Sequence, residues 1–223
     1  MKRIVIAIDG PAGAGKSTIS KIIAEKLKIE FIDTGAMYRA ITLKILQSNI
    51  DLSDELQLLK LLENTSVNFM DNIILLDGKD VSNEIRLPII NEKVSEVATK
   101  FIVRKKLVEL QRQMGLNNNV IMDGRDIGTH VLLNANYKIY LTASVKERAE
   151  RRYIELKNSG IDVEYDKIYS EIEERDLMDS TRKIHPLKKA KDAILLNTTG
   201  KNVDMVVEEI MKIIEEDDNK GCK

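Results

Sequence analysis

A glycine-rich segment near the start of the chain limits the possible folds more than any other feature. Residues 10–17 read Gly-Pro-Ala-Gly-Ala-Gly-Lys-Ser, which matches the pattern G-x-x-x-x-G-K-[ST]. The apolar run at 4–8 precedes it and predicts a strand buried on both faces, and residues 17–28 have the apolar periodicity of a helix. A strand, this loop and a helix in that order form a phosphate-binding loop. The segment therefore predicts an α/β nucleotide-binding fold.

The chemistry of the loop indicates what it binds. Backbone N–H groups of a glycine-rich loop surround a polyphosphate, and the following helix directs the positive end of its dipole at the same anion. Lys16 would contact the β- and γ-phosphates, and Ser17 would bind Mg²⁺. We therefore expect ATP to contact the whole loop, which consists of Gly10, Pro11, Ala12, Gly13, Ala14, Gly15, Lys16, Ser17 and Thr18.

Short apolar runs of strand length recur along the chain and alternate with helical patterns. Such an alternation favours right-handed βαβ units, which build a parallel sheet with helices on both faces. We therefore expect a three-layer P-loop fold around a five-stranded parallel sheet. The other apolar runs lie at 30–32, 120–122, 138–141 and 193–196, and the helical patterns at 17–28, 37–46, 144–156, 164–177 and 203–215.

Residues 64–90 follow a different pattern. Residues 66–69 and 73–76 have an extended pattern, and the dipeptide Asp77-Gly78 is a strong hairpin-turn signal. Helical patterns follow at 87–99 and 102–113. We therefore expect a small antiparallel β segment inserted into the parallel α/β core.

The composition excludes several classes of protein. The 35 Lys and Arg residues nearly balance the 36 Asp and Glu residues, for a formal net charge of −1, which argues against a nucleic-acid or anionic-membrane partner. The single cysteine, Cys222, cannot form an internal disulfide, and His130 and His185 alone cannot complete a structural zinc site. The first apolar run stops at Asp9 and is too short for a signal peptide or a membrane span. We expect a cytoplasmic protein.

The later motifs separate the classes of P-loop protein. A GTPase needs a base-reading N-K-x-D segment, which the sequence lacks, whereas several arginine-bearing segments in one small domain suit phosphoryl transfer to a small acceptor. Residues 10–18 (GPAGAGKST), 33–39 (DTGAMYR), 123–129 (DGRDIGT) and 174–182 (ERDLMDSTR) closely resemble the motifs of bacterial cytidylate kinases, a family of P-loop nucleoside monophosphate kinases. The resemblance spans residues 4–214.

The resemblance implies transfer of the γ-phosphoryl group of ATP to CMP or dCMP in pyrimidine metabolism, with Mg²⁺ as cofactor. It also implies a P-loop kinase core of residues 1–63 and 91–215, an acceptor-binding insertion at 64–90 and a short helical lid at about 145–182. Residues 216–223 are charged and polar, and we expect a disordered tail there. Two alternatives stay open: another acceptor (UMP, AMP or a non-nucleotide acid), and a module that binds ATP without turnover.

The resemblance places the acceptor nucleotide among residues from several segments. Asp126 would accept a hydrogen bond from the N4 amino group of cytosine, which uracil lacks. Asp179 would bind ribose hydroxyls, and Thr34 is also a candidate helix N-cap. The complete acceptor set is Thr34, Arg39, Ser95, Arg104, Arg125, Asp126, Arg175, Asp179 and Arg182.

The helical pattern at 144–156 carries Arg148, Arg151 and Arg152 among several glutamates. The resemblance implies that these arginines close over ATP as part of the lid, whereas a solvated helix with internal ion pairs is the simpler alternative. The catalytic residues it implies are Lys16, Arg125, Arg152 and Arg175.

Two further positions have open interpretations. Asp123 follows an apolar run and either orients Mg²⁺ through water or forms a turn. We interpret His185-Pro186 as a turn, since this chemistry needs no histidine base. We expect a monomer whose partners are ATP and CMP or dCMP.

Overall fold

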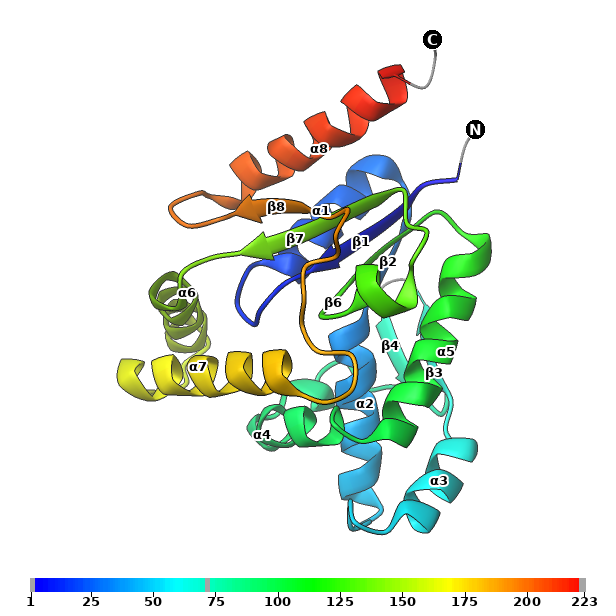
Figure 1. Ribbon diagram of the computed structural model, residues 1–223. Helices are drawn as coiled ribbons and strands as arrows, with labels where there is room; N and C mark the ends of the chain where they lie inside the picture. Colours follow the sequence, from blue (N-terminus) through cyan, green and yellow to red (C-terminus); the bar gives the residue numbers. More distant parts are fainter. Residues whose placement is uncertain (1–2, 71–72, 221–223) are drawn as a thin grey trace.

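A five-stranded parallel sheet forms the centre of the protein (Figure 1). The computed structural model describes residues 3–70 and 73–220. Neighbouring strands of the sheet are parallel throughout and lie in the order β2-β6-β1-β7-β8. This arrangement confirms the predicted α/β fold. The strands are β1 (Val5–Asp9), β2 (Glu30–Asp33), β6 (Val120–Gly124), β7 (Tyr137–Thr142) and β8 (Ile194–Asn197).

Helices lie on both faces of this sheet and beside its carboxyl edge (Figure 1). No helix within the described residues is both long enough and apolar enough to cross a membrane. The helices are α1 (Lys16–Leu27), α2 (Thr34–Gln47), α3 (Glu55–Glu63), α4 (Pro88–Val97), α5 (Phe101–Asn117), α6 (Val145–Asn158), α7 (Tyr165–Thr181) and α8 (Val203–Lys220), with short turns η1 (Glu84–Arg86) and η2 (Ile127–Val131).

Successive residues of β1 enter two different cores, because side chains alternate across a strand. Val5 and Ala7 belong to the core that includes α2 and α5. Ile6 and Ile8 belong to the core that includes α1 and α8. Every residue of β1 is buried, which explains why its first four residues, Val5 to Ile8, are all apolar.

The inserted segment forms an antiparallel sheet, as the sequence predicted. Its strands are β3 (Val67–Met70), β4 (Ile73–Leu76) and β5 (Lys79–Asp80). Asp77 and Gly78 connect β4 and β5 with φ angles of 51° and 79°, and these positive values are those of a tight hairpin turn. Apolar residues of β3 and β4 belong to the same core as α2 and α5, so the insertion is packed on that side of the main sheet.

Two elements differ from the sequence-based expectation. Helix α3 was not predicted. Asp54 caps it by accepting a hydrogen bond from the N–H of Gln57 at 2.9 Å, and Leu58, Leu61 and Leu62 enter the core. Helix α8 continues to Lys220 and so includes the first residues of the tail expected at 216–223, and disorder of that tail stays a prediction. Once a helix is formed, each further residue adds one backbone hydrogen bond. Residues 221–223 lie outside the described residues.

Helices α6 and α7 pack on each other and form a small apolar cluster of their own. Ala149, Ile168 and Ile172 are its buried members. This cluster is separate from the two cores that enclose the main sheet. The pair matches the two helical patterns expected for the lid, and movement of this pair stays a prediction.

Candidate active site

The phosphate-binding loop joins β1 to α1, as its sequence requires. Gly10 begins the loop against β7: a Cβ atom at this position would lie 2.0 Å from the carbonyl oxygen of Leu141. Only glycine therefore allows the loop to leave the sheet along this path. The loop then leads directly into the N-terminus of α1, where free N–H groups and the helix dipole favour an anion.

Lys16 is the first residue of α1, and only 7% of it is exposed. Its ammonium donates a hydrogen bond of 2.8 Å to the carbonyl oxygen of Pro11. Burial, followed by repulsion from Arg125, lowers the pKa of Lys16 to about 7. A polyphosphate beside this nitrogen would favour its charged form.

Asp123 lies inside β6 and is 2% exposed, so the turn interpretation of this residue is wrong. Its Oδ2 accepts a hydrogen bond of 2.5 Å from the hydroxyl of Ser17, and no described group bonds its buried Oδ1. Burial, together with the nearby Asp33, raises the pKa of Asp123 to about 7. A carboxylate and a hydroxyl are hard oxygen donors of the kind that Mg²⁺ prefers, so the pair fits the expected metal.

Thr34 connects the ends of β6 and α2. Its hydroxyl donates a hydrogen bond of 2.7 Å to the carbonyl oxygen of Asp123. The helix is capped instead by Asp33, whose carboxylate accepts from the N–H of Ala36 at 2.9 Å. The N-cap interpretation of Thr34 is therefore wrong, and its contact with the acceptor stays a prediction.

Asp126 lies between two guanidinium groups in the interior. Arg104, 1% exposed, donates to one carboxylate oxygen at 2.5 Å, and Arg182 donates to the other at 3.2 Å. The guanidinium of Arg104 also lies 5.5 Å from the centre of the Tyr38 ring, a cation–π distance. The structure thus joins three predicted acceptor residues from distant parts of the chain.

A second carboxylate, Asp179, lies beside this group. It accepts a hydrogen bond of 2.7 Å from Nε of Arg125, and Arg182 lies 3.6 Å from its other oxygen. Burial opposes ionisation of this carboxyl, but Arg125 and Arg175 hold the pKa of Asp179 below its usual value. These contacts place Arg125 at the carboxyl edge of the sheet, where α/β folds bind ligands.

Arg175 carries the clearest sign of uncompensated positive charge. No described group bonds its buried Nε. Burial, together with repulsion from Arg125 and Arg39, lowers the pKa of Arg175 to about 9. Three arginines that repel one another in a buried region are stabilised when an anion binds among them.

Arg39 and Ser95 lie on facing helices at this site. Nε of Arg39, on α2, donates to Oδ1 of Asn91, on α4, at 3.3 Å. Ser95 follows Asn91 by one helical turn and shares its face of α4. The structure therefore places Ser95 on the side of α4 that faces Arg39, and its contact with a base stays a prediction.

The lid arginines have different environments. Arg148 is 3% exposed, and its guanidinium is hydrogen-bonded within the protein. It donates to the carbonyls of Ala143 and Ala12 at 3.0 and 2.9 Å and to the carboxylate of Asp176 at 2.6 Å. Because Ala12 belongs to the phosphate-binding loop, Arg148 connects that loop to α6 and α7. These contacts favour a positioning role over direct ATP contact. Asp176 directly follows Arg175 in the sequence, and the sequence analysis did not identify it as a partner of Arg148.

The other two lid arginines form the intrahelical ion pairs of the simpler alternative. Arg151 pairs with Glu147 at 3.0 Å and also donates to the carbonyl of Thr198 at 2.8 Å. Arg152 pairs with Glu155 at 2.8 Å, and 36% of its side chain is exposed. Exposed pairs of this kind contribute little free energy, so a phosphate could displace either partner readily.

We expect Arg148→Met to destabilise the fold by about 2–3 kcal/mol, because it leaves the carboxylate of Asp176 and two carbonyls without their donor. The KM for ATP should rise, since the loop loses its connection to α6. Thermal unfolding and steady-state kinetics measure both effects. Arg152→Met is the matched variant: it should leave Tm nearly unchanged and lower kcat. Equal Tm values for the two variants would contradict the different roles assigned to them.

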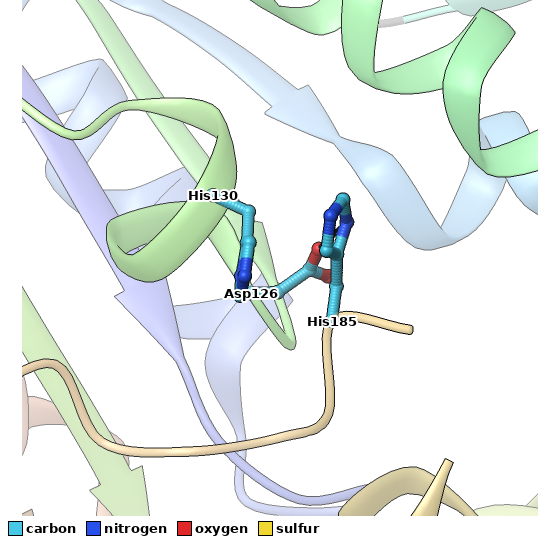
Figure 2. A group of neighbouring side chains, drawn as sticks. All are labelled: Asp126, His130 and His185. Carbon is cyan, nitrogen blue, oxygen red and sulfur yellow. Dashed lines mark ion pairs between the residues drawn. The ribbon is translucent and has the colours of Figure 1, made fainter. Parts of the chain in front are cut away.

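Asp126 also meets two histidines, which the sequence did not associate with the site (Figure 2). The rings of His130 and His185 are stacked, with centres 3.9 Å apart, and Nδ1 of His185 lies 3.5 Å from Asp126. The three residues are close enough to suggest a metal centre. However, Arg104 and Arg182 already bind the carboxylate and would repel a divalent cation. Nearly parallel rings also direct their nitrogen lone pairs side by side rather than toward one point. The group is therefore better explained by stacking and ion pairing.

His185 keeps the turn role expected for it. Its φ angle is 49°, and its carbonyl oxygen accepts a hydrogen bond of 2.7 Å from Nε of Arg182. The turn thereby holds Arg182 in place beside Asp126. The adjacent Pro186 predicts a turn at this position. No local pattern reveals the contact of His185 with His130, which is 55 positions away in the sequence.

Comparison with known proteins agrees with this geometry. The cytidylate kinase family model matches residues 6–216. A cytidylate kinase of Alkaliphilus oremlandii is 54% identical over 215 residues, covering 96% of this chain and 99% of that protein. A cytidylate kinase of Clostridioides difficile is 49% identical over 214 residues, covering 96% and 99%. A shikimate kinase structure from Bacteroides thetaiotaomicron, 15% identical, has a TM-score of 0.52 over 95% of this chain and 98% of that one, which supports the fold alone. The chain belongs to the cytidylate kinase family.

Proposed function

We propose that this protein transfers the γ-phosphoryl group of ATP to CMP or dCMP, giving ADP and CDP or dCDP. Membership of the cytidylate kinase family supports this reaction. The observation that carries it is the buried Asp126, held by Arg104 and Arg182 beside a group of arginines next to the phosphate-binding loop. A base-reading carboxylate and a phosphate-binding region then lie side by side, as a nucleoside monophosphate requires.

Base selection follows from the chemistry of Asp126. Asp126 accepts hydrogen bonds from Arg104 and Arg182, and a carboxylate accepts hydrogen bonds and donates none. The N4 amino group of cytosine is a donor, whereas uracil has a carbonyl oxygen at that position. Uracil would bring two acceptors together in a buried place, and such a mismatch is costly.

Catalysis requires charge neutralisation and alignment rather than a general base, because the acceptor phosphate is already ionised at neutral pH. The loop from Gly10 to Thr18 would bind the phosphates of ATP, and Lys16 would neutralise the γ-phosphoryl group. Arg125 and Arg175 would hold the acceptor phosphate in line with it. Arg152 would join them as the lid closes and excludes water.

Ser17 and Asp123 are the residues that would hold Mg²⁺, with Asp123 acting through water. The metal would neutralise charge on the β- and γ-phosphates of ATP. The unpartnered Oδ1 of Asp123 supports this role, since a buried carboxylate oxygen without a donor is otherwise unfavourable.

The proposed state is a cytoplasmic monomer with ATP and CMP or dCMP as partners, and with no nucleic acid or membrane partner. The near-zero net charge disfavours polyanionic surfaces as partners.

An acceptor panel tests the function directly. With ATP and Mg²⁺ held constant, ADP release is measured with CMP, dCMP, UMP and AMP as acceptors. We expect kcat/KM for CMP or dCMP to exceed that for UMP and AMP by at least about 10-fold, from the cost of an unpaired buried polar group. Better turnover with UMP or AMP would contradict the cytidylate assignment. ATP binding without acceptor-dependent ADP release would indicate a nucleotide switch instead of an enzyme.

A further inference from the structure

The carboxylate of Asp9 lies at the centre of the site without belonging to any motif role assigned above. Asp9 ends β1 and is followed directly by Gly10 of the phosphate-binding loop. It is 4% exposed, and both of its oxygens are used. One accepts the N–H of Ile127 at 2.7 Å, and the other accepts the N–H of Gly128 at 2.8 Å. Both contacts are to backbone N–H groups of the protein itself.

The two N–H groups belong to the turn that follows the residues proposed to read the acceptor. Asp9 is paired with Gly124 across the sheet, and Arg125 and Asp126 follow Gly124 immediately. Ile127 and Gly128 then begin the turn η2. The carboxylate of Asp9 therefore binds the chain directly after Asp126 and fastens it over the end of β1.

Gly128, on the other side of this contact, has little free space beside its Cα atom. A Cβ atom on Gly128 would lie 3.3 Å from Oδ2 of Asp9 and 3.2 Å from Cδ of Lys138. A side chain at Gly128 would therefore push the turn away from Asp9 by a few tenths of an ångström. Burial raises the pKa of Asp9 to about 6, while the two N–H bonds favour its ionised form, so this carboxyl is charged at pH 8.

We propose that Asp9 is a positioning residue that fixes Asp126 and Arg125 relative to the phosphate-binding loop, and so determines both acceptor affinity and base selection. This inference rests on the proposed function. Asp9 is adjacent to Gly10, the first residue of the phosphate-binding loop. Because its carboxylate also binds the turn after Asp126, it would hold that turn at a fixed distance from the ATP phosphates. Small misplacements of reacting groups reduce rates strongly.

The test is Asp9→Asn, assayed at pH 8. An asparagine accepts with only one oxygen and directs an NH₂ donor at the other N–H, so one side of the turn is released. We expect the KM for CMP to rise about 10-fold or more and the CMP/UMP ratio of kcat/KM to fall, while the KM for ATP changes less than about threefold. Ile210→Val, on the buried face of α8, is the control for lowered stability; it should leave both KM values and the ratio unchanged.

The outcomes distinguish this inference from the proposed function. A wild-type enzyme that prefers another acceptor would contradict the function itself. A lower Tm in Asp9→Asn, with unchanged KM for CMP and unchanged CMP/UMP ratio, would overturn the positioning role alone. If Asp9→Asn does not fold, Gly128→Ala loosens the same contact from the opposite side and decides the question. It should raise the KM for CMP about two- to tenfold, and an unchanged KM and ratio would overturn the proposal.

Discussion

Replacing Lys16 with alanine is expected to lower kcat by about 100- to 1,000-fold or more, the loss typical when a charge-stabilising group is removed from a transition state. Lys16 is buried at the start of α1, where negative charge develops on the transferred phosphoryl group. Its ammonium bonds a loop carbonyl at 2.8 Å, and no carboxylate among residues 3–70 and 73–220 bonds it directly. Single-turnover kinetics with ATP and CMP would measure the effect on chemistry.

The same substitution should not lower Tm. Burial and repulsion from Arg125 lower the pKa of Lys16 to about 7, which means that the folded state disfavours this charge. The sign follows from linkage: a lysine with a lowered folded-state pKa destabilises the fold increasingly as pH falls from 10.5 toward 7. Lys21→Ala, an exposed position on α1, is the matched control and should leave kcat unchanged. Near-normal turnover in Lys16→Ala would contradict the assignment of the loop.

Asp126→Asn is expected to change both selectivity and stability. The CMP/UMP ratio of kcat/KM should fall by at least about 10-fold, because the asparagine NH₂ can donate to the carbonyl oxygen of uracil. Removal of the charge also leaves Arg104 and Arg182 without their shared carboxylate. Breaking a buried pair from one side costs about 3–5 kcal/mol. Parallel kinetics with the two acceptors and thermal unfolding would measure both changes.

A double-mutant cycle with Arg104→Met separates the two effects. If Arg104 and Asp126 stabilise each other, the double variant should lose less stability than the sum of the single variants, since it removes the buried guanidinium of Arg104 together with its partner. Selectivity should remain low in every variant that lacks Asp126. A CMP/UMP ratio equal to the wild-type value in Asp126→Asn would contradict the base-reading role, whatever the change in Tm.

Local signals predicted the elements that build the site, and failed where a signal was weak or the partner distant. The apolar run at 4–8, the glycine loop and the Asp77-Gly78 turn each contain their own structural reason. Helix α3 had such a signal in its Asp54 cap and leucine spacing, but it was not recognised. At the start of α2 a capping signal was present but was assigned to the wrong residue. Asp33 and Thr34 are both suitable N-caps, and only the folded chain shows that Asp33 is the cap.

The sequence by itself determined the fold class, the phosphate-binding loop and the family, because those depend on contiguous motifs and on the order of strands and helices. Only the tertiary structure decided which charged side chains remain free for substrates. Arg148 and Arg152 lie on one helix, yet Arg148 is bonded to Ala12 and Asp176, whereas Arg152 is partly exposed. Burial and pairing between residues far apart in the chain set these differences, and no local pattern encodes them. The contact of Asp9 with the turn after Asp126 has the same origin, since it joins positions 118 residues apart.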